Sequence, residues 1–248
     1  MDRVLVVTGG SRGIGAEVAR LGAEQGYKVC VNYARNKAAA QDVVKTIRDN
    51  GGEAMMAHAD VAEEADAKAM FRLVDQELGP VTALVNNAGI IDQTGRVADM
   101  TAERINRILA VNVTGSFLCA REATLRMSKE HGGPGGAIVN VSSAAARLGS
   151  PGEFVDYAAS KGAMDTFTIG LAKELAAEGI RVNAVRPGLI DTEIHAAAGD
   201  AERVERFRTA VPMQRVGSAA EVAEAVLWLL SDSASYVTGS FIDVAGGR

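Results

Sequence analysis

The 248-residue sequence is poor in cysteine and proline, with 2 and 5 residues of these types against 27 glycines. Cys30 lies in an apolar run and Cys119 in a segment of helical periodicity. Both positions are typical of buried thiols that behave as small hydrophobic side chains, so we expect no disulfide. Few prolines and many glycines fit a packed chain with many tight turns and argue against disorder.

The sequence also lacks the features of proteins that act at membranes or on nucleic acids. No apolar stretch approaches the ~20 residues that span a bilayer, and residues 1–3 lead into a strand-like run without a signal-peptide pattern. The formal net charge is -5, and no Lys/Arg-rich run is present that would neutralise a phosphate backbone. We therefore expect a cytoplasmic protein that binds neither membranes nor nucleic acids.

Metal-ligand patterns are missing as well. The three histidines, His58, His131 and His195, are scattered without the spacing of a metal site, so we expect no bound metal. Hydrophobic residues make up 48% of the chain and charged residues 23%, as in packed globular proteins. Because α/β folds of about 200–250 residues are often one domain, we expect a single domain over residues 1–248.

Short β-rich runs alternate with segments of helical periodicity along the chain. Strands are predicted at 3–8, 28–33, 53–58, 81–86, 137–142, 180–186 and 240–244. Helices are predicted from Ile14 onwards and at 37–49, 63–78, 101–128, 155–178 and 218–231. Such alternation implies right-handed crossovers between parallel strands. We expect an α/β fold, a Rossmann-type doubly wound parallel sheet of about seven strands between two layers of helices.

Two segments depart from this alternation. Residues 189–212 are polar and alanine-rich, and we interpret them as a mobile flap of mixed charge within the same domain. Gly132–Gly136 is interpreted as a simple connection. The last helix begins at Ser218, with Glu221 three residues later, which is the pattern of a capping box.

A glycine-rich turn, Thr8-Gly-Gly-Ser-Arg-Gly-Ile-Gly15, joins the first strand to the first helix. Its outer glycines, at positions 9, 13 and 15, permit close approach of a pyrophosphate to the backbone, and the helix N-terminus favours its negative charge. A plain tight turn is the alternative, because the spacing differs from the common G-x-G-x-x-G pattern. The position between strand and helix favours a dinucleotide site.

Tyr157 and Lys161 lie four residues apart in a predicted helix, so their side chains share one face. A nearby ammonium favours the phenolate and lowers the pKa of a tyrosine from its usual value near ~10. The pair is therefore a candidate proton-transfer device. Alone, the spacing also fits a solvated helix face.

Further motifs follow the glycine turn in a fixed order. They are Asn86-Asn-Ala-Gly89, Asn112, Val141-Ser-Ser143, Tyr157-x-x-x-Lys161, Pro187-Gly188 and Tyr236-Val-Thr-Gly239. From Val4 to about Gly247 the chain resembles the short-chain dehydrogenase/reductase family. Its general pattern is most similar to 3-oxoacyl-[acyl-carrier-protein] reductases and the glucose dehydrogenase-like members.

The resemblance implies a catalytic tetrad of Asn112, Ser143, Tyr157 and Lys161. Tyr157 would exchange a proton with the substrate oxygen, Ser143 would hydrogen-bond that oxygen, and Lys161 would lower the pKa of Tyr157 and hold the nicotinamide ribose. Asn112, at a local break in its helix, would position a water relay to Lys161. Ser143 lies 14 residues before Tyr157, one more than in many relatives, so Ser142 stays an alternative.

The resemblance also implies a set of cofactor contacts, from the phosphate turn to the loop that holds the nicotinamide carboxamide. They are Gly9, Ser11, Arg12, Gly13, Ile14, Gly15, Tyr33, Arg35, Asp60, Val61, Asn87, Ala88, Gly89, Tyr157, Lys161, Pro187, Gly188, Ile190 and Thr192. Asp60 could instead cap the helix that begins near Glu63.

The second strand predicts which cofactor is preferred. NAD binders usually carry Asp or Glu at its end, whereas here Tyr33 takes that place and Arg35 follows. Arg12 would add a second guanidinium, and arginine engages phosphate through a bidentate fork. We expect NADP(H) rather than NAD(H), unless Arg35 is simply solvated and Arg12 pairs with an acid elsewhere.

We thus expect an NADP(H)-dependent oxidoreductase that interconverts a carbonyl compound and a secondary alcohol. The alternatives are an NAD-dependent sugar or alcohol dehydrogenase and a catalytically silent nucleotide-sensing member. An acyl thioester on a carrier protein would need a basic rim, for which Arg126, Lys129 and Lys173 are the candidates. The family resemblance suggests a homotetramer, with a dimer as the alternative, and helices 101–128 and 155–178 and the segment Phe241–Gly247 are the surfaces that could pair.

Overall fold

The computed structural model describes residues 3–192 and 208–248. Seven parallel strands form one sheet in the order β3-β2-β1-β4-β5-β6-β7. They are β1 (Arg3–Val7), β2 (Tyr27–Tyr33), β3 (Ala54–His58), β4 (Ala83–Asn86), β5 (Gly136–Val141), β6 (Ile180–Pro187) and β7 (Phe241–Val244). The predicted doubly wound sheet is confirmed, whereas a single domain over 1–248 stays a prediction.

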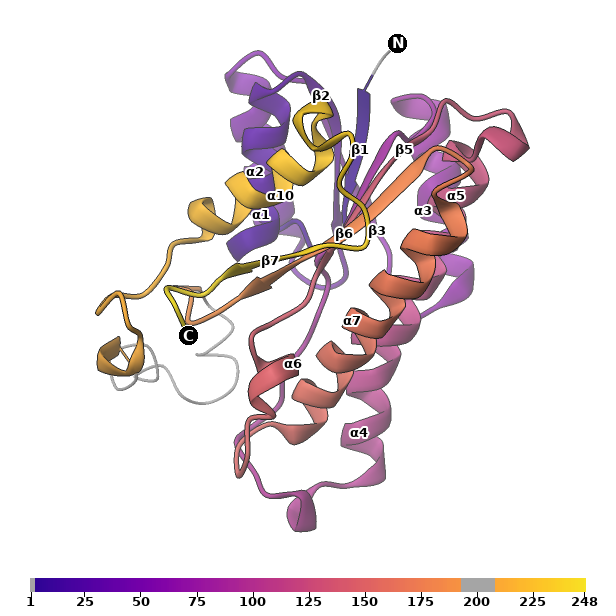
Figure 1. Ribbon diagram of the computed structural model, residues 1–248. Coiled ribbons are helices and arrows are strands. Elements are labelled where there is room, and N and C mark those ends of the chain that lie inside the picture. The colour runs from indigo at the N-terminus through magenta and orange to yellow at the C-terminus, as the bar shows by residue number, and fades with distance from the viewer. Residues whose placement is uncertain (1–2, 193–207) are drawn as a thin grey trace.

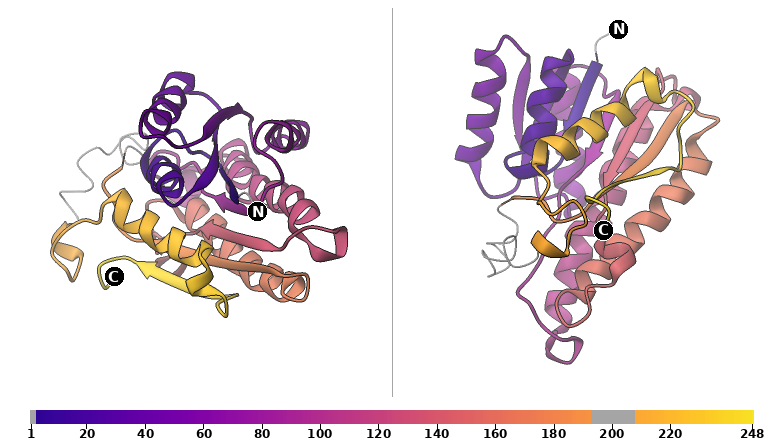
Figure 2. Two further views of the ribbon diagram at one scale, coloured as in Figure 1. Left: turned by 90° about the horizontal axis from the view of Figure 1, so that it is seen from above. Right: turned by 60° about the vertical axis from the view of Figure 1, so that its left-hand side comes forward.

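Helices cover both faces of this sheet (Figures 1 and 2). The main ones are α1 (Gly13–Glu24), α2 (Lys37–Asp49), α3 (Glu64–Glu77), α4 (Ala102–Leu109), α5 (Gly115–Met127), α7 (Val155–Leu175) and α10 (Ala219–Leu230). One hydrophobic core lies between the sheet and α1, α2 and α10, and a second lies under α3, α5 and α7. The architecture is therefore a three-layer α/β/α sandwich.

The first strand shows why both faces are buried. Leu5 and Val7 belong to one core and Val4 and Val6 to the other, and all four side chains are fully buried. Because side chains alternate between the faces of a strand, a continuous apolar run fits a strand with helices above and below it. This is why short uninterrupted apolar runs predicted the strands well.

The strand order places a crevice in the middle of the sheet. From β1 the chain moves outwards through β2 and β3, and from β4 it moves the other way through β5, β6 and β7. Connections that leave in opposite directions open a gap at the carboxyl ends of β1 and β4, where doubly wound sheets bind ligands. The glycine turn after β1 and the Asn86–Gly89 segment therefore border the same crevice.

The expected helix 101–128 is interrupted. A π-helical turn, Ala110–Thr114, separates α4 from α5, and such turns occur mostly as single insertions within α-helices. Sequence periodicity also missed the short helix α6 (Ala145–Leu148). The capping box is confirmed, since Ser218 Oγ accepts from the Glu221 amide and Glu221 Oε2 accepts from the Ser218 amide.

The segment 189–212, which the sequence predicts to be a flap, lies largely outside the described residues. Its described ends are the isolated bridge between Ile190 and Gly217 and the 3-10 turn Arg208–Ala210. Cys30 and Cys119 are buried free thiols, as predicted. Among the helices of residues 3–192 and 208–248, none is long and apolar enough to cross a membrane.

Candidate active site

The turn between β1 and α1 requires its glycines. Gly9 and Gly13 adopt positive φ angles of 61° and 54°, a region that favours glycine. A Cβ atom on Gly15 would lie 2.6 Å from the carbonyl oxygen of Gly9 and 2.5 Å from the side-chain nitrogen Nδ2 of Asn87. The start of α1 thus packs directly on the turn. The resulting cradle of backbone at a helix N-terminus fits a pyrophosphate.

Asn87 and Thr8 tie this cradle to the end of β4. The Asn87 side chain donates to the carbonyls of Thr8 and Gly9 at 2.9 and 3.0 Å. The Thr8 hydroxyl accepts from the amides of Asn87 and Ala88, both at 3.0 Å. The structure therefore joins Gly9, Asn87 and Ala88, which the sequence assigned to one cofactor site.

Asn32 supports the same turn, although no sequence motif predicted its role. Its Oδ1 accepts from the Gly9 amide at 3.0 Å, and its Nδ2 donates to the carbonyls of Ala57 and Ala59. Asn32 is 2% exposed, so one buried amide links the turn after β1 to the end of β3. A polar residue near the end of an otherwise apolar strand was the available signal.

The residues predicted to select the cofactor lie around the end of β2. The Tyr33 ring is buried and lies 5.4 Å from the His58 ring, centroid to centroid. Arg35 and Arg12 are exposed, and Arg12 occupies the N-cap position of α1. The end of β2 thus presents an aromatic ring and an arginine where an NAD site carries a carboxylate.

Asp60 does not cap α3. That helix begins at Glu64 with Glu63 as its N-cap residue, whereas Asp60 Oδ1 accepts from the Ala62 amide at 3.0 Å in the preceding turn. The capping alternative is therefore wrong. Val61 is buried, and a Cβ on Gly115 would lie 2.7 Å from its side chain, so this turn is packed against α5.

A third loop, after β6, reaches the same glycine turn. A Cβ on Gly13 would lie 3.4 Å from the Thr192 methyl group. Ile190 is held at the start of this loop by its bridge to Gly217, and Gly188 packs so closely on Ala245 that a Cβ there would lie 2.7 Å away. The predicted nicotinamide loop, Pro187 to Thr192, therefore lies beside the predicted phosphate turn.

Tyr157 and Lys161 share one face of α7, and Lys161 Nζ lies 5.7 Å from the centroid of the Tyr157 ring. Nζ donates a 2.7 Å hydrogen bond to the carbonyl of Val141 at the end of β5. The phenol hydrogen-bonds Ser143. The neighbouring Ser142 instead donates to Asp165 at 2.6 Å. Of the two serines, the fold brings Ser143 to the phenol.

Burial governs the protonation of this pair. Desolvation raises the pKa of Tyr157 above its ordinary value of 10.0, and the hydrogen bond with Ser143 opposes the shift. Burial lowers the pKa of Lys161 to about 8, against the opposing effect of the Asp165 carboxylate. The expected net lowering of the Tyr157 pKa is therefore wrong for this structure, because desolvation of the buried phenol is the largest influence on it. With its pKa raised above 10.0, the Tyr157 phenol keeps its proton at neutral pH.

Asn112 lies in the π-helical turn and is 1% exposed. Its Oδ1 accepts from the Ile90 amide at 2.7 Å, and its Nδ2 donates to the Ile90 carbonyl and to Ser160 Oγ. A Cβ on Gly89 would lie 3.5 Å from both Asn112 Oδ1 and Lys161 Nζ. The four tetrad candidates therefore border one site. Ser160, fully buried within the Tyr157–Lys161 segment, was missed as the partner of Asn112.

The predicted basic rim does not border this site. Lys129 and Arg126 lie where α5 ends, and the Lys129 amide donates to the Glu178 carbonyl just before β6 begins. Lys173 lies near the end of α7, whereas Tyr157 lies at its start. These cations therefore sit at the amino ends of the strands, opposite the site. Arg126 is also neutralised by Asp75 and Glu122.

Comparison with known proteins agrees with this arrangement. The family model described as Enoyl-(Acyl carrier protein) reductase matches residues 9–248. The uncharacterized oxidoreductase YgfF of Escherichia coli strain K12 is 60% identical over 245 residues, which cover 99% of each chain. The 3-oxoacyl-[acyl-carrier-protein] reductase FabG of Staphylococcus aureus strain Mu50 is 38% identical over 247 residues, which cover 100% of this chain and 98% of that protein. The chain belongs to the short-chain dehydrogenase/reductase family of oxidoreductases.

Proposed function

We propose that this protein is an NADP(H)-dependent reductase of carbonyl compounds, which in the reverse direction oxidises secondary alcohols. The observation that carries the proposal is the meeting of Ser143, Tyr157, Lys161 and Asn112 beside Gly89. Gly89 follows β4, next to the glycine cradle at the end of β1. Proton-transfer groups and a dinucleotide cradle are thus combined in one crevice.

The residues present fit a nicotinamide dinucleotide. A side chain at Gly15 would collide with backbone, and Gly13 has a positive φ beside Thr192, so the turn leaves its amides open to a phosphate. Gly9, Ser11, Arg12 and Ile14 complete this turn, and Asp60, Val61, Asn87, Ala88, Gly89, Pro187, Gly188 and Ile190 flank it. The bound dinucleotide supplies the hydride that is added to the carbonyl carbon.

The protein's own residues handle the proton. Tyr157 donates its phenolic proton to the substrate oxygen, while Ser143 hydrogen-bonds the phenol and steadies the same oxygen. The phenolate that forms is stabilised by the Lys161 ammonium on the next turn of α7. Asn112 completes this group of polar side chains, and its hydrogen bonds with Ile90 and Ser160 fix its position. Addition of a hydride to the carbonyl carbon and of the proton to the carbonyl oxygen gives the alcohol.

A panel of substrates tests the proposal directly. We would follow the consumption of NADPH and of NADH against simple ketones, 3-oxoacyl thioesters and sugars, and run the reverse reaction on the matching alcohols. NADPH-dependent reduction of at least one ketone or thioester supports the proposal. Activity confined to NAD⁺ and sugars would favour the dehydrogenase alternative, and binding without turnover of any compound would favour a nucleotide sensor.

Arg35→Asp tests the cofactor preference. Arg35 is exposed just after β2, so a carboxylate there would repel a 2′-phosphate and accept the ribose hydroxyls instead. We expect the ratio of kcat/KM for NADPH to that for NADH to fall at least about tenfold, the effect of losing one charge-assisted contact. Arg96→Asp, an exposed arginine in the loop before α4, is the matched control. An unchanged ratio would show that Arg35 is only solvated.

The buried Lys161 predicts a pH dependence. Because the pKa of Lys161 is lowered to about 8, its ammonium is charged below that pH and is lost as the pH rises through it. We expect kcat/KM for NADPH, which reports ionisations of the free enzyme, to fall above pH about 8. Initial rates between pH 6 and 10 at saturating ketone measure this, with circular dichroism as the check on folding. A profile that stays level beyond pH about 9.5 would contradict it.

We further propose that the protein assembles as a homotetramer. Leu109, Phe117 and Leu125 on α4 and α5 and Ile169 on α7 are large hydrophobic side chains between 38% and 49% exposed. Phe117 stacks on Phe167 at 3.8 Å between ring centroids, which joins these helices into one apolar surface. β7 is the last strand of the sheet, and in the part of the chain that the structure describes no further strand pairs with its outer edge. Two such surfaces are what a closed assembly of four copies uses.

A further inference from the structure

A carboxylate lies immediately before Tyr157 in the sequence. Asp156 is in the first turn of α7, and its side chain is only 3% exposed. It pairs with Arg104 of α4 through two bonds, from Nε to Oδ2 at 2.7 Å and from Nη2 to Oδ1 at 3.3 Å. Asp156 Oδ1 also accepts from the Tyr157 backbone amide at 2.9 Å. The ion pair therefore contacts the backbone of Tyr157 itself.

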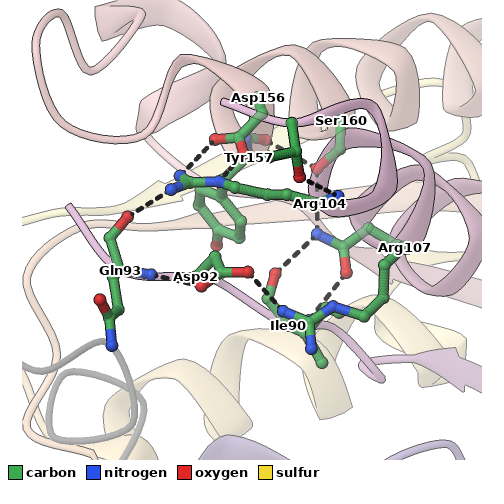
Figure 3. A network of polar contacts seen from close by, with 10 residues as sticks. Ile90, Asp92, Gln93, Arg104, Arg107, Asp156, Tyr157 and Ser160 are labelled. Carbon is green, nitrogen blue, oxygen red and sulfur yellow. Dashed lines mark hydrogen bonds and ion pairs between the residues drawn. The ribbon is translucent and has the colours of Figure 1, made fainter. Parts of the chain in front are cut away.

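The same guanidinium holds the loop that follows β4. Arg104 Nη1 donates to the Gln93 carbonyl at 2.7 Å, and Figure 3 shows the guanidinium between this carbonyl and the Asp156 carboxylate. The Gly95 amide donates to the Glu153 carbonyl, just before α7. Residues 90–95 are thus attached to the start of α7 through both a side chain and the backbone.

The beginning of this loop is attached to the proposed active site. Ile90 exchanges two hydrogen bonds with Asn112, which in turn donates to Ser160 on α7. Residues 90–95 are therefore held at two points (Figure 3). Ile90 bonds to Asn112 of the tetrad, and Gln93 bonds to Arg104 of the Arg104–Asp156 pair. The loop therefore starts at a tetrad residue, Asn112, and is held again at the helix turn that carries Tyr157.

We propose that Arg104 and Asp156 form a positioning pair, which fixes the start of α7 with Tyr157 and keeps residues 90–95 as a wall of the substrate site. The positioning role of the pair depends on the proposed function, in which Tyr157 donates a proton to the substrate oxygen. Because the Arg104–Asp156 pair is bidentate and little exposed, its two side chains are held in one orientation more rigidly than those of a solvated ion pair. Displacements of about 1 Å at a reacting group cost up to ~100-fold in rate, so such a pair affects turnover more than cofactor binding.

The helix that carries Arg104 also provides a matched control. Arg107, three residues on, pairs with Asp92 of the same loop, but this pair is far more exposed, with 48% and 25% of the two side chains accessible. Asp92 Oδ1 accepts from the neighbouring Gln93 amide. Within residues 3–192 and 208–248, Arg107 thus pairs with the loop and makes no hydrogen bond or ion pair with α7. Loss of Arg107 removes an equal charge from the same helix and leaves the contact with Tyr157 in place.

The experiment compares Asp156→Asn, Arg104→Gln, the double variant and Arg107→Gln. Turnover is expressed per NADPH-binding site, titrated by fluorescence, so that an unfolded fraction does not count. We expect kcat to fall at least about tenfold in each single variant of the pair, with the NADPH dissociation constant within about twofold. The double variant should be no slower than the slower single variant, because both remove the same contact. Arg107→Gln should stay within about twofold of the unchanged protein.

Hydrogen exchange followed by mass spectrometry gives a readout that needs no turnover. Peptides covering residues 90–96 and 155–158 should exchange faster in Asp156→Asn and Arg104→Gln than in the unchanged protein. In Arg107→Gln, exchange of both peptides should stay close to that of the unchanged protein, because the exposed Arg107–Asp92 pair adds little to the hold on the loop. Unchanged exchange at 155–158, or kcat values equal to that of Arg107→Gln, would overturn the inference. If the unchanged protein reduces no carbonyl compound, the proposed function fails, and exchange alone decides whether the pair holds the two segments.

Discussion

Replacing Tyr157 with phenylalanine is expected to lower kcat for carbonyl reduction at least about a hundredfold, the contribution typical of a general acid. The phenol is the group with a raised pKa and a hydrogen bond to Ser143 at the site, so its removal leaves no donor in the same place. The ring itself is unchanged, and its packing beside Lys161 should persist. Steady-state rates with NADPH and the best ketone of the panel measure the effect.

Two further measurements make this result specific. NADPH binding, titrated by fluorescence, should change by less than about threefold, because the phenol is only one of many cofactor contacts. Tyr236→Phe removes the same hydroxyl from a fully exposed side chain and should leave kcat unchanged. A Tyr157→Phe protein that binds NADPH and retains more than about a third of the original kcat would contradict the role of Tyr157 and revive the idea of a different proton donor.

Replacing Gly15 with alanine is expected to destabilise the protein and abolish tight NADPH binding. The added Cβ would lie 2.6 Å from the Gly9 carbonyl oxygen and 2.5 Å from the Asn87 side-chain nitrogen. Because one of these atoms is backbone, the start of α1 must move away from the cradle. Overpacking of this kind costs about 1–3 kcal/mol, and each lost Asn87 hydrogen bond about 1 kcal/mol more. We expect the free energy of unfolding to fall by about 2–4 kcal/mol and NADPH affinity to fall at least about tenfold.

The same substitution elsewhere should have the opposite sign. Gly162 is also helical, and a Cβ there would meet no atom within 4 Å. Alanine is favoured over glycine in a helix by about 1 kcal/mol, so Gly162→Ala should raise the free energy of unfolding. Urea denaturation of both variants measures the contrast. A Gly15→Ala protein as stable as the original, with NADPH affinity intact, would show that the turn is a plain connection.

The secondary structure and the order of motifs could be predicted from the sequence because they depend on local patterns. Apolar runs of strand length, such as Val4–Val7, are buried on both faces whatever the partner strand is. The glycine turn and the pair Tyr157 and Lys161 were also recognisable, since a fixed spacing on a helix or turn implies proximity. The interruption of the helix at Asn112 was expected from the family resemblance alone, because π-turns leave no strong periodic signal.

The wrong predictions concern properties that depend on the whole fold. The prediction of a basic rim was wrong because, in a parallel sheet, the loops that precede strands lie at the opposite end of the sheet from the loops that follow them. Lys129 precedes β5. The pKa of Tyr157 shifts upwards because the fold buries the phenol, and burial is a tertiary quantity. The Arg104–Asp156 pair joins residues 52 apart, with no motif to indicate the contact.

By itself, the sequence determined the sheet, the glycine cradle, the family and the face shared by Tyr157 and Lys161, because each follows from spacing along one strand, turn or helix. Only the tertiary structure decided which serine reaches the phenol, how burial sets the pKa values of Tyr157 and Lys161, and which residues support the site from behind. These depend on strand phase, on the solvent that neighbouring elements exclude, and on contacts between distant segments. A linear pattern carries none of these.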